Sequence, residues 1–179
     1  MPSLQKADDR FMRRYEIIEN GSGFFRGVID EPKQGQVPVY QFVTDRRLLR
    51  VNPGVPVEAG MVIRTGNGSV FIVGRHGDAE EIYDSFRLVE PTGRYEWGRR
   101  SKTVDAITGL EGDSGVVSQG LIWGSYEPAA TEMFDRQIRM GFETGRFVTN
   151  KPVALDDIVD GKRVTRADRQ LGLYVLTIG

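Results

Sequence analysis

Two segments of the chain resemble each other and point to a repeated unit. Residues 23–32 read GFFRGVIDEP and residues 120–128 read GLIWGSYEP. Both give glycine, two apolar residues, one large residue and glycine, and then an acidic residue with proline. Further matches follow in the same order, between residues 42–45 and 147–150 and between residues 70–73 and 173–176. Ordered matches at similar separations are typical of a duplicated module. The alternative is chance likeness between short β motifs.

Glycine-containing turns separate short runs of β-branched and aromatic residues, which is the pattern of strands joined by turns. The clearest predicted hairpin joins residues 61–64 to residues 70–73. Its turn, TGNG at residues 65–68, offers glycines and an asparagine where positive φ is needed. The turn NGSG at residues 20–23 predicts a second hairpin. Further strands are expected at residues 39–44, 48–51, 82–89, 116–117, 121–123 and 173–178, whereas residues 132–140 fit either a strand or a short helix.

A single helix is predicted, at the N-terminus. Ser3 is a good N-cap, and apolar side chains recur at helical spacing up to Tyr15, so the helix is expected to end near Arg14. The predicted fold is therefore mainly β, with small β-barrel or sandwich modules in two copies and one N-terminal helix. We expect a first module at residues 1–92, a linker or long loop at residues 93–113, and a second module at residues 114–179.

Composition narrows the function classes. The 24 basic and 25 acidic residues give a formal charge of −1, which provides no global attraction to nucleic acid or acidic lipid. The absence of cysteine excludes disulfides, thiolate catalysis and cysteine-based zinc sites. The first ten residues are charged where a signal peptide is apolar, and no apolar run is long enough to cross a membrane. We expect a cytoplasmic protein without a membrane partner.

The most enzyme-like motif is Gly-Asp-Ser-Gly at residues 112–115, which surrounds the nucleophile in chymotrypsin-like serine proteases. The one histidine, His76, precedes Ser114 by only 38 residues, too few to place the two on separate barrels. We therefore expect no catalytic residues, and keep a hydrolase using Ser114 as a minor alternative. The acidic cluster at residues 156–160 lacks the order of a calcium loop, so we expect neither a metal nor a cofactor.

Aromatic and basic residues alternate in one otherwise polar stretch. Tyr95, Trp97, Arg99 and Arg100 lie together there, and exposed aromatics beside arginine favour interface centres. We predict that these four residues form a subunit interface, to which the N-terminal helix also contributes. The alternative is a nucleic-acid surface on which aromatics stack against bases.

Residues 57–64 (VEAGMVIR), followed by a turn and residues 70–73 (VFIV), resemble a motif of head–tail joining proteins of tailed bacteriophages. Residues 155–159 with residues 172–176 are a looser second example. In that family a Gly-Asp turn is usual, where this chain has Ala59-Gly60-Met61. The resemblance covers about forty residues well.

The resemblance implies a structural virion protein of the head-completion, stopper or neck class. Such a protein forms a ring of identical subunits at the head–tail junction, assembled in the host cytoplasm, with no catalytic residues. The implied partners are further copies of the chain, portal, adaptor or tail proteins, and DNA passing through the ring. A capsid-decoration or tail structural protein is the alternative, because it shares the β-rich, cysteine-free profile.

Overall fold

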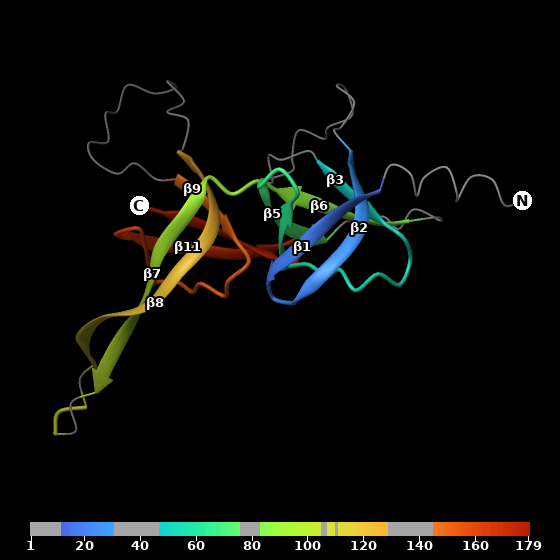
Figure 1. Cartoon of the computed structure of the whole chain (residues 1–179). Coiled ribbons are helices and arrows are strands. Elements are labelled where there is room, and N and C mark those ends of the chain that lie inside the picture. The colour runs from blue at the N-terminus through green and yellow to red at the C-terminus, as the bar shows by residue number, and fades with distance from the viewer. Residues whose placement is uncertain (1–11, 31–46, 76–82, 105–106, 110, 129–144) are drawn as a thin grey trace, which may run out of the picture. The chain divides into compact units, whose positions relative to one another are not determined.

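The described part of the protein consists of two closed β-barrels. The computed structural model describes residues 12–30, 47–75, 83–104, 107–109, 111–128 and 145–179, and these residues form strands but no helix. The chain divides into two compact units, Met1–Pro91 with Leu171–Leu173, and Thr92–Gln170 with Tyr174–Gly179. Each unit contains one barrel (Figure 1). The mainly β, duplicated small-barrel fold is thus confirmed.

The first barrel has the strand order β1-β2-β3-β6-β5-β4, and antiparallel pairing of β1 with β4 closes it. Both predicted hairpins are present. Asn20 and Gly23 have φ values of 57° and 101° in the β1–β2 turn, and Gly68 has a φ of 91° in the β4–β5 turn. Glycine and asparagine adopt this region most readily, so the local sequence sets both turns. The strands are β1 (Arg13–Glu19), β2 (Gly23–Asp30), β3 (Leu48–Val51), β4 (Val62–Thr65), β5 (Val70–Arg75) and β6 (Asp84–Val89).

The second barrel repeats this topology. Its order is β10-β11-β12-β9-β8-β7, closed by the pairing of β10 with β7. Adding six to each strand number of the first barrel reproduces every neighbour of the second, so the two barrels are copies of one module. The strands are β7 (Gly93–Val104), β8 (Glu111–Pro128), β9 (Gly145–Thr149), β10 (Ile158–Val159), β11 (Lys162–Gln170) and β12 (Leu173–Ile178).

The register of the first hairpin is also repeated. In the first barrel Ile17 pairs with Gly23 and Tyr15 with Phe25. In the second, Trp97 pairs with Gly120 and Tyr95 with Ile122. The matching segments at residues 23–32 and 120–128 therefore begin at equivalent points of equivalent strands, β2 and β8, as a duplication requires.

The other two sequence matches do not align equivalent strands. Residues 70–73 lie in β5, whose counterpart is β11, whereas residues 173–176 lie in β12. Residues 147–149 belong to β9, whose counterpart is β3 at Leu48–Val51, and residues 42–45 lie outside the described residues. These matches misled because every half-buried strand alternates apolar and polar residues, so short strands resemble one another whatever their place in the sheet.

Two further expectations need correction. Within the expected linker at residues 93–113, the structure instead places residues 93–104 in strand β7 and residues 111–113 at the start of β8. Its polar sequence resembled a loop because much of this strand pair is exposed. Arg13 and Arg14, at the end of the expected helix, belong to β1. The remainder of that helix lies outside the described residues, as do the expected elements at residues 39–44 and 132–140. Within the described chain no helix is long and apolar enough to cross a membrane.

Alternate residues along the strands fill the core of each barrel. At some equivalent positions, a large side chain in one core corresponds to a smaller one in the other. At one pair of equivalent positions, Phe25 in β2 corresponds to Ile122 in β8. At another, Leu49 in β3 corresponds to Phe147 in β9. All four side chains are buried, with exposed fractions of 7% or less. The total volume is thereby preserved while the aromatic ring moves to a neighbouring strand, which close packing tolerates.

Candidate assembly interface

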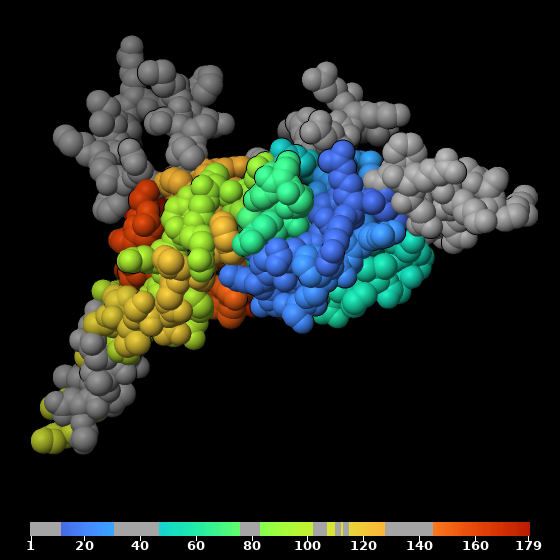
Figure 2. All heavy atoms as spheres, in the orientation of Figure 1, coloured from blue at the N-terminus to red at the C-terminus, as the bar shows by residue number. Residues whose placement is uncertain are grey.

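The second barrel carries an extension that the first lacks. In the first barrel, residues 18–22 connect the Ile17–Gly23 pair. In the second, residues 98–119 connect the equivalent Trp97–Gly120 pair, and we call these residues the arm. The arm continues the β7–β8 hairpin away from its own barrel (Figure 1) and forms a narrow projection in the space-filling view (Figure 2).

The base of the arm is marked by a β-bulge between Trp97 and Gly98. Bulges bend a strand pair and increase its twist, so this one redirects the hairpin where it leaves the barrel. A side chain at Gly98 would force Val116 to move, because a Cβ there would lie 2.3 Å from Cγ1 of Val116. The pairing then continues from Arg99 opposite Val117 to Val104 opposite Glu111.

The arm and its base expose apolar side chains. Val116, Val117 and Leu121 are 52%, 53% and 49% exposed, and Ile107 near the turn is 95% exposed. Among the described strands, β7 beyond Gly98 and β8 before Gly120 pair only with each other, so both edges of the ribbon are open. An isolated two-stranded ribbon is at best marginally stable in water, and open edges readily pair with other chains. The arm is thus suited to contact another molecule.

Two of the four predicted interface residues belong to the barrel core. Trp97 is 9% exposed, and its indole N–H donates to Oδ2 of Asp157 over 3.0 Å. Tyr95 is half-buried and packs edge-on against Phe147, with ring centroids 5.1 Å apart. The sequence predicts exposed aromatic side chains here, but Trp97 is buried and Tyr95 is half-buried, so exposure no longer supports placing either aromatic in an interface.

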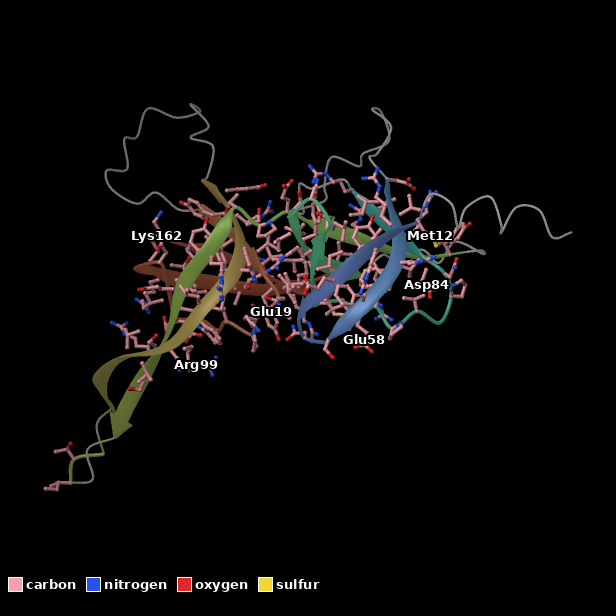
Figure 3. The ribbon with its side chains drawn as sticks, in the orientation of Figure 1. Met12, Glu19, Glu58, Asp84, Arg99 and Lys162 are labelled. Atoms are coloured by element: carbon pink, nitrogen blue, oxygen red, sulfur yellow. The ribbon has the colours of Figure 1, made fainter. Side chains whose placement is uncertain are left out.

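The other two predicted residues, Arg99 and Arg100, are exposed at the start of the arm. Arg99 Nε lies 3.5 Å from Oδ1 of the buried Asp157, and its guanidinium donates to the Pro152 carbonyl over 3.2 Å. Arg99 thus ties the base of the arm to the barrel, where Figure 3 labels it. Arg100 pairs with Val116 across the ribbon. Each of the two exposed valines, Val116 and Val117, therefore lies opposite an arginine on the neighbouring strand.

The residues considered for catalysis and metal binding have other surroundings. Residues 112–115 lie in β8 on the arm, where Gly112 pairs with Thr103. The side chains of Ser114 and His76 lie outside what the structure describes. Of the acidic cluster, Asp156 forms an ion pair with Arg163, Asp157 supports Trp97, and Asp160 occupies the β10–β11 turn with a φ of 51°. Among the described residues no group of three acidic or histidine side chains is placed to hold a metal.

The comparisons with known proteins identify no relative. No family model matches the chain, and neither the curated proteins nor the solved structures contain a match. The functional argument therefore depends on the geometry of the chain itself.

Sequence reasoning missed the residues that the arm exposes. The sequence predicts a strand of the second module at Val116 and Val117, and it gives no functional signal at Ile107 in the arm or at Leu121 beside it. The available signal was charge and glycine content: residues 98–120 contain six charged residues and five glycines around these apolar side chains. That mixture is unusual for a barrel strand and is typical of an exposed hairpin.

Proposed function

We propose that the protein is a structural assembly protein whose subunits associate through the arm into a homo-oligomeric ring. The observation that carries this proposal is the exposure of Val116, Val117 and Ile107 on a ribbon with two open edges. Each barrel is a closed body of its own, and the arm extends from the second barrel as a separate contact element. An arm that is separate from the barrels suits a protein that acts by binding other subunits rather than by catalysis.

The energetics require more than one arm contact for each subunit. Complete burial of a Val or Ile side chain contributes about 1.5–3 kcal/mol. Val116 and Val117 are about half exposed and Ile107 is 95% exposed, so their burial would contribute roughly 3–6 kcal/mol per arm. Association costs at least about 4 kcal/mol in lost translational and rotational freedom. One arm alone therefore does not hold two subunits firmly, and each subunit needs two arm contacts, which is the number that a closed ring provides.

We further propose that this ring is the connector or neck at the head–tail junction of a tailed bacteriophage. Support comes from the segment that resembles head–tail joining proteins, which runs through β4 and β5 as a hairpin of the first barrel. In that role the partners are portal, adaptor or tail proteins, with DNA passing through the ring. The gene neighbourhood tests this context, because portal, capsid and tail genes should adjoin this gene. Their absence would contradict the connector role.

The assembly itself is tested by measuring mass in solution with native mass spectrometry and light scattering. We expect the parent protein to give one defined multiple of the 20.1 kDa subunit. The double variant Val116→Ser, Val117→Ser should dissociate at concentrations where the parent is assembled. Leu155→Ser is the matched control, because Leu155 is 59% exposed on the second barrel outside the arm. A monomeric parent would refute the proposal.

A further inference from the structure

The arm has two long edges, and each presents backbone groups that no described strand pairs with. β7 pairs with β10 at Trp97 and Gly98 and no further out, and β8 pairs with β9 only from Gly124 onward. In an antiparallel pair, alternate backbone N–H and C=O groups point away from the partner strand. Both edges of the arm therefore offer a row of hydrogen-bonding groups to a further strand.

The two edges differ in charge. The β7 edge begins with two exposed arginines, Arg99 and Arg100. On the β8 side, residues 114–126 contain neither a charged residue nor a proline. Charged side chains and proline are the usual features that prevent an edge strand from pairing with another chain. The β8 edge lacks both and is open to pairing, whereas two β7 edges would bring arginines together at a cost in stability.

Rotational symmetry determines which edges meet when identical arms lie side by side in a ring. All arms then have one orientation, so the β7 edge of one arm faces the β8 edge of the next. Because β7 runs out along the arm and β8 returns, this pairing is antiparallel, as it is within each arm. Pairing of two β8 edges would use one edge of each subunit and end at a dimer. Pairing of β7 with β8 uses both edges of every subunit.

We propose that the β7 edge of each arm pairs with the β8 edge of the arm in the next copy, so that the arms form one continuous sheet around the ring. This inference rests on the proposed assembly through the arm and names the contact that joins the arms. Main-chain hydrogen bonds hold it, as in other cases where a strand is added to a sheet edge. In the register found within each arm, the neighbour's Arg99 and Arg100 flank Val117 and Val116 on their second side. The aliphatic stems of these arginines then cover part of the exposed valine surface.

Amide hydrogen exchange tests the edge pairing directly. It is measured by mass spectrometry on the assembled parent and on the double variant Val116→Ser, Val117→Ser, which is expected to be dissociated. In the parent, the amides of residues 99–101 and 115–121 should have protection factors roughly tenfold higher or more, because hydrogen bonds between subunits must open before exchange. Residues 62–65 in β4, which pair on both sides within the first barrel, are the control and should exchange alike in both proteins.

Cross-linking tests the same contact, because the chain has no cysteine of its own. Arg100→Cys is mixed with Ser118→Cys, and a short thiol-to-thiol reagent is added. Both positions are exposed and lie on different strands of the arm. We expect a covalent dimer containing one copy of each variant. Leu155→Cys mixed with Ser118→Cys is the control and should give none. Absence of the mixed dimer in the assembled protein, or covalent dimers of Ser118→Cys alone, would overturn the inference.

The exchange results also separate this inference from the proposed function. Protection of the β8 segment alone would show pairing of two β8 edges. Protection of neither segment in an assembled parent would show that the arms meet through side chains only. Either result overturns the edge pairing and leaves assembly through the arm standing. If the parent is monomeric, the proposed function itself fails.

Discussion

The two barrels share a strand order and a hairpin register, but the hairpin that opens each barrel ends differently. In the first barrel the β1–β2 pairing ends at Ile17, and a short connection with Asn20 at positive φ reverses the chain to Gly23. In the second, the chain passes the equivalent residue, Trp97, and continues into the arm. One module can therefore serve as a closed body in one copy and carry a contact element in the other. The difference lies in a hairpin end, where insertions leave the barrel pairing intact.

The largest expected effect comes from removing this difference. We predict that replacing residues 98–119 by residues 18–22 abolishes assembly, because the arm is lost while the closing strands are kept. Glu19 pairs with Val62 in the first barrel much as Gly98 pairs with Ile158 in the second, so the transplanted turn fits. Native mass spectrometry should give a monomer, and circular dichroism should stay dominated by strand. An oligomer of unchanged mass would show that assembly does not depend on the arm.

The second prediction compares the residues that precede the two hairpin ends. Trp97→Ala should lower the free energy of unfolding by about 3–5 kcal/mol, because it leaves a cavity and removes the indole donor to Asp157. Ile17→Ala at the equivalent position should cost about 2–5 kcal/mol, towards the lower end because less volume is lost. Denaturant titration measures both. Trp97→Ala that assembles poorly but unfolds like the parent would place Trp97 in an interface instead of the core.

The third prediction concerns two equivalent glycines that face the exchanged core residues. A Cβ at Gly124 would lie 2.0 Å from the Phe147 ring, whereas a Cβ at Gly27 would lie 2.8 Å from the Arg50 carbonyl oxygen. Gly124→Ala should therefore destabilise the protein by about 1–3 kcal/mol through overpacking, because the ring must move. Phe147→Leu, which restores the residue type of the first barrel, should relieve that cost. Thermal unfolding of the single and double variants tests this coupling, and strictly additive effects would contradict it.

The smallest expected effect is a difference in alkaline stability. Burial raises the pKa of Tyr15, with weaker opposing effects from Arg13 and a backbone hydrogen bond. The folded state therefore disfavours the tyrosinate. The contribution of neutral, buried Tyr15 to the stability of the fold is complete below the unfolded pKa of roughly 10. That contribution is lost as the pH rises above that value. Tyr15→Phe should flatten the fall in stability above roughly pH 10, measured by urea titration. An equal fall in the variant would show that Tyr15 does not contribute.

Much of the local structure was determined by the sequence alone. The NGSG and TGNG turns specified their hairpins because positive φ is a local property of glycine and asparagine. Apolar runs located β3, β6 and β12, and the match between residues 23–32 and 120–128 revealed the duplication. None of these inferences required knowledge of residues distant in the chain.

Only the tertiary structure decided which strands correspond and which side chains are buried. Trp97 among arginines indicates a surface from sequence, yet a carboxylate sixty positions later, Asp157, satisfies its indole inside the barrel. The sequence predicts a strand at Val116 and Val117 but not its exposure, and no third strand among those described covers these two side chains. Burial depends on which distant strands pair and where a hairpin leaves its sheet. Alternation along one strand carries no information about either, which is why the arm emerged only from the folded chain.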